Sequence, residues 1–511
     1  MYLYPSINLQ KLPFFNFPCN MKRYYLFILV LFIPLFLNAQ FMMRRQTTIV
    51  KAPDSIDISY YAPKKFWGAA AQVFSLNMGI WGIDRYALKA DFAYIGTKSI
   101  WSNIKEGLYW DNDQIGTNMF LHPYHGSLYY NSARAKGYNY WESGAFALGG
   151  SVMWEFFMEN EHPSSNDLIA TPVGGLALGE VFYRLSDLAL DDRDRGMERF
   201  KHEFIAFLIA PTRGLTRILN GDAWRVRRTS GRQFGMPMMT IEAAVGMRTL
   251  QRNNKIDKKS RGGVMLLNMT YGDRYEVDNS KPYNYFSMRS QINMQAGQPA
   301  LGQINIIGQL WATELKDTEK DFLSLGVYQH FDYFDSDTLA GTSEKTPYKI
   351  AAPAVVGIGL IHKNKRLGAW RFNSSLHANA IILGASLSDY YKVGNRDYNL
   401  ASGFGVKAGA NIAYRDKIGV SWIYEGFRLY TFKGYPEGID LETVDYNELN
   451  AQGDKSNATF NTSSLRVDCK LWDRLYLSAL VRGYRRSTHY KYFDDIYSFS
   501  GEGQLLLNYK F

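Results

Sequence analysis

The last residues of the chain alternate between apolar and polar side chains up to a terminal aromatic residue. Leu505, Leu507, Tyr509 and Phe511 occupy every second position, and Leu506 is the one apolar residue between them. A period of two predicts an extended strand with two unlike faces, because successive side chains of a strand point to opposite sides. The chain therefore ends on a strand that separates an apolar from a polar environment.

The same alternation recurs through the C-terminal half of the chain. Turn signals divide this half into about twelve segments of strand length. The predicted strands lie near residues 238–251, 263–275, 284–296, 301–314, 321–334, 349–362, 367–386, 399–415, 417–433, 459–472, 474–487 and 497–511. Segments of roughly 10 to 15 alternating residues can cross an outer membrane when they are tilted.

Connector lengths favour a membrane barrel over a soluble β-sandwich, which is the alternative fold for this pattern. Connectors on the side of Phe511 are mostly short and those on the other side are mostly longer, with the connector at 297–300 as the exception. An even number of strands with this asymmetry is typical of bacterial outer-membrane barrels. A last strand ending in Phe also resembles their assembly signal. The sequence predicts such a barrel over residues 238–511, with Phe511 on the periplasmic side, and hence outer-membrane lipid and the barrel assembly machinery as partners.

The N-terminal region has the features of an export signal. Lys22 and Arg23 precede an apolar run over residues 24–37, which a small residue follows. A basic segment, an apolar segment and a small exit residue are typical of a secretory signal peptide. We therefore expect a signal peptide over residues 21–39, with translation starting at Met21.

The period of the pattern changes between the two halves of the mature chain. A polar, proline-containing linker (40–64) precedes a region of helical period (65–224), and a basic connector (225–237) joins that region to the barrel. The fold class predicted is an α+β membrane protein, with an N-terminal periplasmic helical domain followed by an antiparallel transmembrane barrel of about twelve strands. The helical region is predicted to form six short helices, and a barrel of this size is too narrow to enclose them. The helical domain is therefore expected beneath the barrel, in the periplasm.

Two local features are predicted within the helical region. Thr171 is placed as an N-cap, with Pro172 at the first helical position, because both residue types favour those sites. Gly175 and Gly179 lie one helical turn apart, which allows another helix to approach closely.

The net charge of +10 does not indicate a nucleic-acid partner. The basic residues are scattered along the chain, and no basic helix or base-stacking module is present. An exported protein meets anionic lipid head groups instead.

A histidine pair near two aspartates is the first candidate site. His122 and His125 lie three residues apart around a predicted helix start, close to Asp111 and Asp113. This spacing can direct two imidazoles at one metal ion, and the carboxylates can complete its coordination. The alternative is a plain helix start, since the spacing matches no established zinc pattern.

Charged residues on two further helices are the other candidates. Glu155 and Glu159 are one helical turn apart. They predict either a pair of carboxyls for acid–base catalysis or a solvated, acidic helix end that pairs with a neighbouring arginine. Glu180 and Arg184 begin a ladder of alternating charges, which is typical of a polar stripe between helices.

Three stretches of the helical region resemble one family. Trp110–Asp113, Thr117–Gly126 and Pro163–Pro172 occur in order and are similar to the family of the domain of unknown function DUF3943. The resemblance covers roughly residues 80–195 and implies an exported envelope protein, without implying a reaction or a cofactor. Among the polar residues of this region, it selects as site candidates His122, His125, Asp167, Glu180 and Arg184.

These features favour an outer-membrane protein that organises the envelope, or that binds or passes a small or lipidic ligand. The alternative is an envelope hydrolase or transferase acting on lipid, lipopolysaccharide or peptidoglycan. Its catalytic candidates are His122, His125, Glu155, Glu159 and Glu180. The binding candidates are Asp111, Asp113, Asp167 and Arg184, and the metal-ligand candidates are His122 and His125.

Overall fold

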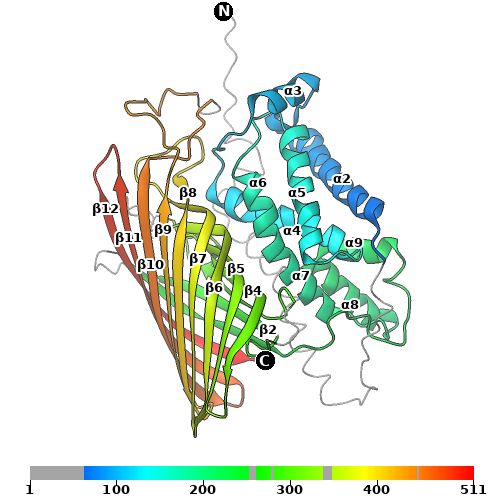
Figure 1. Ribbon diagram of the computed structural model, residues 1–511, viewed down its shortest axis with the longest axis vertical. Coiled ribbons are helices and arrows are strands. Elements are labelled where there is room, and N and C mark those ends of the chain that lie inside the picture. The colour runs from blue at the N-terminus through cyan, green and yellow to red at the C-terminus, as the bar shows by residue number, and fades with distance from the viewer. Residues whose placement is uncertain (1–62, 253–260, 278–280, 338–347, 446–447) are drawn as a thin grey trace, which may run out of the picture.

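A computed structural model describes residues 63–252, 261–277, 281–337, 348–445 and 448–511. The predicted signal peptide and nearly all of the predicted linker lie outside these ranges. Helices occupy the first part of the described chain and strands the second part (Figure 1). This order agrees with the predicted fold class.

The helical region contains α-helices interrupted by short 3₁₀ and π turns. Its elements are α2 (Phe66–Gly82), η3 (Ile83–Leu88), η4 (Asp91–Ala93), α3 (Thr97–Glu106), η5 (Thr117–Leu121), α4 (His122–Arg134), α5 (Tyr140–Phe157), α6 (Asp167–Ile169), η6 (Ala170–Gly174), α7 (Gly175–Ala189), α8 (Gly196–Ile209) and α9 (Pro211–Leu219). Local side-chain chemistry explains where several of these helices begin. Asn139 and Glu142 form a reciprocal capping box at α5, and Pro211 opens α9.

The helix around Pro172 begins earlier than predicted. Asp167–Ala189 is one continuous helical stretch, and Thr171 and Pro172 lie inside its π turn η6 and not at its start. A π turn shifts the backbone hydrogen bonds, so the missing N–H of proline is tolerated there. This stretch is long and apolar enough to cross a membrane, but 72% of its apolar window is buried inside the molecule.

Glycines allow α4 and α7 to approach to backbone contact. A Cβ atom on Gly126 would lie 1.8 Å from the carbonyl oxygen of Thr171, and one on Gly175 would lie 2.6 Å from the carbonyl carbon of Gly126. The ring of Tyr130 packs against Gly179 in the same way. The structure thus uses Gly175 and Gly179 for close helix packing.

Within the described residues, twelve antiparallel strands form a closed barrel. They are β1 (Met239–Arg252), β2 (Arg261–Tyr271), β3 (Phe286–Met294), β4 (Leu301–Asp317), β5 (Asp321–Phe334), β6 (Ile350–Leu367), β7 (Trp370–Leu387), β8 (Tyr398–Tyr414), β9 (Ile418–Tyr430), β10 (Ser456–Trp472), β11 (Leu475–Tyr490) and β12 (Ile496–Lys510). Each pairs with its sequence neighbours, and β1 pairs with β12 to close the ring, with Val245 opposite Leu507. The predicted barrel and its strand number are confirmed.

The two faces of the barrel wall differ in chemistry. Outward-facing residues such as Val245, Val481 and Leu505 are apolar and more than half exposed. The inward face carries buried charges, and its side chains reach across the lumen. Arg289 of β3 donates to Glu425 of β9 at 2.8 Å, on the opposite wall.

Further contacts close the lumen between these walls. Arg482 of β11 donates to Gln303 of β4 at 2.7 Å, and the rings of Tyr348 and Tyr484 stack with centroids 4.0 Å apart. A polar cavity of about 410 Å³, bordered by Arg289 and Glu425, remains within the lumen. The described side chains therefore bridge the barrel from wall to wall.

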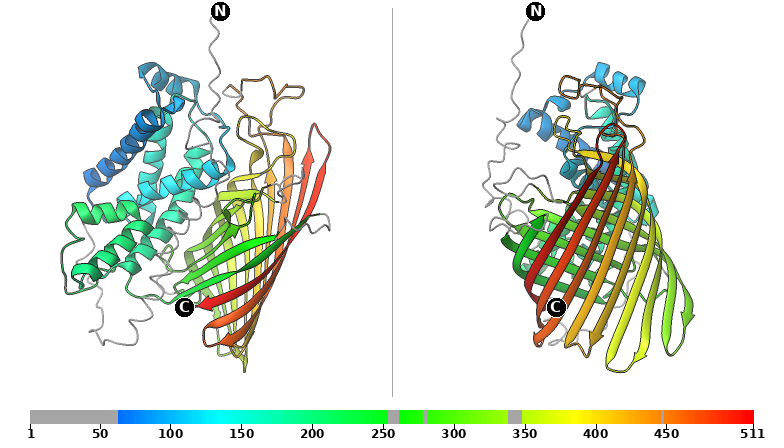
Figure 2. Two further views of the ribbon diagram at one scale, coloured as in Figure 1. Left: turned by 180° about the vertical axis from the view of Figure 1, so that it is seen from behind. Right: turned by 90° about the vertical axis from the view of Figure 1, so that its left-hand side faces the viewer.

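The helical bundle lies beside the barrel and packs on its outer wall (Figures 1 and 2). Three outward-facing residues of β5 are covered by helices. Gln329 donates to the carbonyl oxygen of Val173 at 2.8 Å, Phe331 packs near Gly174, and the ring of Tyr333 contacts that of Phe120. The sequence predicts the bundle beneath the barrel; the structure places it alongside, because these outward side chains provide a surface on which it packs.

Candidate metal centre

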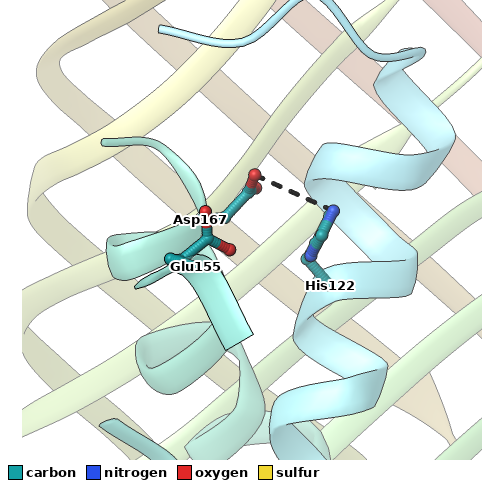
Figure 3. Close-up of side chains that lie close together, drawn as sticks. All are labelled: His122, Glu155 and Asp167. Atoms are coloured by element: carbon teal, nitrogen blue, oxygen red, sulfur yellow. Dashed lines mark ion pairs between the residues drawn. The ribbon is translucent and has the colours of Figure 1, made fainter. Parts of the chain in front are cut away.

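Three side chains from three helices converge near one end of the bundle. His122 opens α4, Glu155 lies in the last turn of α5 and Asp167 opens α6. One ligand atom from each lies within 4.8 Å of the others, and Nε2 of His122 is 3.8 Å from Oδ2 of Asp167. Figure 3 shows the three side chains pointing toward one another. Glu155 and Asp167 are each only 2% exposed.

Local structure explains how these residues come together. The π turn η5 immediately precedes His122, and the π turn η6 follows Asp167 closely. Such turns insert an extra residue into a helix and often occur at functional sites. Glu155 is held in place because its carboxylate accepts a hydrogen bond from the backbone N–H of Ser164 at 2.8 Å.

Asp111 adds a further carboxyl to the three side chains of the site. Its side chain hydrogen-bonds to that of Asp167, and it also accepts a hydrogen bond from the amide of Asn118. The backbone N–H of Asp111 donates to the side chain of Asn166. Two carboxyls that share a hydrogen bond require a proton on one of them or a cation between them.

The loops around the site hold several acidic side chains that are buried away from water. Burial raises the pKa of Asp113 to about 7, and the charges of Asp111 and Glu161 add to the rise. Burial also raises the pKa of Glu159 well above its ordinary value, with Glu155 and Glu161 as further causes. Burial acts on Asp111 in the same direction, but hydrogen bonds and the charge of His122 lower its pKa overall. A bound cation would relieve this accumulation of buried negative charge.

The donor set suits a divalent metal ion. Ligand atoms around a tetrahedral zinc ion stand roughly 3.3–3.6 Å apart, given bond lengths of about 2.0–2.2 Å. The 3.8 Å between His122 and Asp167 is close to this separation, so a small contraction brings the group to coordination geometry. One imidazole with carboxylate oxygens suits Zn²⁺, Fe²⁺ or Mn²⁺.

Comparison with known families identifies the region that carries this site. Residues 107–212 match the family described as Domain of unknown function (DUF3943). This part of the chain is a DUF3943 domain. His122, Glu155 and Asp167 all lie within it, as the resemblance of the sequence motifs predicts for His122 and Asp167.

Solved structures with similarity to the chain include a porin, an outer membrane protein and a transporter. The NanC porin is 9% identical with a TM-score of 0.24, and the match covers 52% of this chain and 98% of that one. OmpT, an outer membrane protein of Vibrio cholerae, is 8% identical with a TM-score of 0.24 (54% and 97%). The Pseudomonas putida toluene transporter TodX is 8% identical with a TM-score of 0.20 (54% and 90%). No curated protein matches the chain.

Two other predicted site residues border the cluster without joining it. The ring of His125 packs on Tyr129 and Trp154, and its buried Nε2 atom has no hydrogen-bond partner. The carboxylate of Glu159 accepts a hydrogen bond from the indole of Trp154. The structure therefore pairs His122 with Glu155 and Asp167, and not with His125, as the nearest set of donors.

Glu180 and Arg184 lie in a different part of the DUF3943 domain. Glu180 is fully buried, forms ion pairs with Arg134 at 2.9 Å and with Arg184 at 2.8 Å, and accepts a hydrogen bond from Tyr130 at 2.6 Å. Arg184 also donates to the carbonyl oxygen of Pro282 in the β2–β3 connector. This network joins the bundle to the barrel.

Glu180→Ala should therefore destabilise the protein strongly. It leaves the buried Arg184 and the mostly buried Arg134 without their carboxylate, and breaking a buried pair typically costs about 3–5 kcal/mol of unfolding free energy. Thermal melting followed by circular dichroism at a helical wavelength measures the loss. Glu198→Ala is the control, because its ion pair with Lys201 is solvent-exposed, and it should leave the melting temperature nearly unchanged. Equal melting of both variants would contradict the structural role of Glu180.

Residues from the barrel complete the surroundings of the site. Arg396 donates to the carbonyl oxygen of Asp111 at 2.5 Å, and the hydroxyl of Tyr398 donates to that of Asp113 at 2.9 Å. Tyr391 donates to the side chain of Asn112 at 3.0 Å. Sequence reasoning missed these residues because they lie about 280 positions away along the chain and carry no local signal. They tie the loop of Asp111 to the β7–β8 connector.

Proposed function

We propose that this chain is an integral outer-membrane protein that binds a divalent metal ion in its DUF3943 domain. The membrane location is supported by the closed barrel and by its apolar outward face. In a bilayer, a closed barrel satisfies every backbone hydrogen bond between strands, and its apolar side chains face lipid. Export by the predicted signal peptide is part of the proposal.

The metal site rests on one observation, the convergence of His122, Glu155 and Asp167 within 4.8 Å. Buried carboxyls without a cation are costly, since each must take up a proton or lose its hydration uncompensated. A metal ion turns the same cluster into a stabilising centre that ties α4, α5 and α6 together. Among the ligand-binding roles that the sequence favours, metal binding is the one we propose.

The barrel serves as an anchor in this proposal, and not as a general pore. Arg289 and Glu425 span its lumen, as do Arg482 and Gln303. Arg396 of the β7–β8 connector and Tyr398 at the start of β8 hold the loop of Asp111 beside the metal ligands. The barrel thus positions the site in the membrane and braces it.

An envelope hydrolase is the second candidate function. The observation that favours it concerns the carboxyl of Glu159. Burial and the charge of Glu155 raise the pKa of this carboxyl, which belongs to no ion pair among the described residues. A carboxyl beside a metal ion can act as a general base on metal-bound water in hydrolysis.

Elemental analysis of the purified protein tests the metal site. The full chain, extracted from membranes in detergent without chelators, should carry a stoichiometric transition metal. His122→Ala and Asp167→Asn should each lower its affinity more than roughly tenfold, because each removes a ligand. The matched control is His489→Ala, since His489 is exposed and pairs with Asp495 far from the site. Wild-type metal content in both ligand variants would refute the site.

A further inference from the structure

We propose that the helical bundle itself extends into the membrane, with the outer faces of α2 and α5 in contact with the acyl chains of the bilayer. This inference goes beyond the metal site but rests on the proposed outer-membrane location of the barrel. It replaces the periplasmic position expected for the bundle with a position beside the barrel inside the bilayer.

The first observation is the composition of α2. No charged residue occurs between Lys65 and Asp84, although much of this helix is exposed. Its exposed large side chains are Phe66, Trp67, Phe74 and Met78. The uncharged run is roughly 27 Å long at 1.5 Å per residue, close to the apolar band of about 25 Å on outer-membrane barrels.

The second observation is that α5 continues the same surface. It lies parallel to α2: Lys64 forms an ion pair with Glu142 at 2.6 Å, and Asn77 donates to the carbonyl oxygen of Gly150 at 3.1 Å. Between Glu142 and the buried Glu155, α5 carries no charge. Its exposed large side chains are Trp141, Leu148, Val152 and Phe157. A broad exposed apolar surface of this kind marks an interaction site on a protein.

The third observation is that α5 runs alongside the barrel wall, from the middle of β4 and β5 toward the end of the longer connectors. Near its start, Tyr140 stacks on Tyr283, whose backbone N–H donates to Gln309 midway along β4, and the hydroxyl of Tyr140 donates to Gln329 of β5. Near its other end, Glu155 borders the loop of Asp111, which Arg396 holds from that end of the barrel. The helix therefore runs beside the half of this wall that ends at the longer connectors.

Lipid is the occupant that these observations favour. The bundle covers outward-facing residues of β5 such as Phe331, on the wall that a barrel otherwise presents to the bilayer. Once helices occupy that position, their own outer surface is continuous with the apolar belt of the neighbouring strands. The polar metal cluster then lies at the end of the longer connectors, opposite Phe511.

Spin labels in lipid vesicles test this arrangement on the full chain. Cys469 is replaced by serine, and single cysteines are introduced as Phe74→Cys, Val152→Cys, Val481→Cys or Lys98→Cys. Each label's collision rates with oxygen, which partitions into lipid, and with a water-soluble nickel complex are measured. Val481 is the barrel reference, and Lys98 is an exposed polar position on α3.

Labels at Phe74 and Val152 should match the label at Val481, with high oxygen and several-fold lower nickel collision rates than the label at Lys98. A lipid signal at Val481 combined with nickel accessibility at both Phe74 and Val152 would overturn the inference and indicate a surface for water or a protein partner. Nickel accessibility at Val481 as well would refute the membrane barrel itself, so the two failures are distinguishable.

Discussion

A planar lipid bilayer containing the purified protein should show no steady ion conductance. A porin of similar strand number would conduct continuously if its lumen were open. In this barrel, Arg289 and Glu425 meet across the lumen, and the stacked rings of Tyr348 and Tyr484 close it further. The ring of Phe460 packs beside Tyr484, with centroids 6.2 Å apart. Ions therefore have no continuous aqueous path through the described side chains.

Removal of the aromatic side chains should open the lumen. The triple variant Tyr348→Ala/Phe460→Ala/Tyr484→Ala is expected to show discrete conductance steps, because it deletes three packed rings from the interior. Tyr497→Ala is the matched control, since Tyr497 points outward and is 71% exposed. Barrel assembly is checked by the migration of unheated samples on gels. Porin-like conductance of the wild-type protein would contradict the closed lumen.

Gly126→Val should unfold the helical bundle while the barrel stays assembled. Its side chain would collide with the carbonyl oxygen of Thr171, which is backbone and cannot rotate away. Overpacking of a core usually costs about 1–3 kcal/mol, and we expect more here because two helix backbones must separate. Circular dichroism should show loss of helix, and limited proteolysis should remove the bundle.

The control for this substitution is Gly149→Val. Gly149 is exposed on α5, and a Cβ atom there would meet nothing within 4 Å. Valine is also a better helix former than glycine, so this variant should retain the wild-type protease resistance. If Gly126→Val resisted protease as well as Gly149→Val, the close packing of α4 and α7 would not be essential to the bundle.

The strands were the most predictable part of the molecule. Their alternation reports which of two environments each side chain meets, and that information is local. The terminal pattern of Leu505, Leu507 and Tyr509 is the clearest case, because these residues face outward on β12. The start of the helix before Pro172 was not predictable, since a π turn absorbs the proline without a local signature.

The candidate site was predictable only in part. His122, Asp167 and Glu155 could each be named from motifs or from spacing, but their convergence could not. It depends on the distance at which α4 meets the helix of Gly175, which the contact at Gly126 sets. Arg396 could not be found at all, because its contact with the loop of Asp111 joins segments 285 residues apart.

The sequence by itself determined a helical region followed by an antiparallel barrel of about twelve strands, because period and turn chemistry are properties of neighbouring residues. Only the tertiary structure decided where the bundle sits and which acidic groups meet His122. Both depend on contacts between distant segments, such as Gln329 with Val173 and His122 with Asp167. These contacts follow from how closely packed backbones can approach, and no pattern within a single segment encodes that distance.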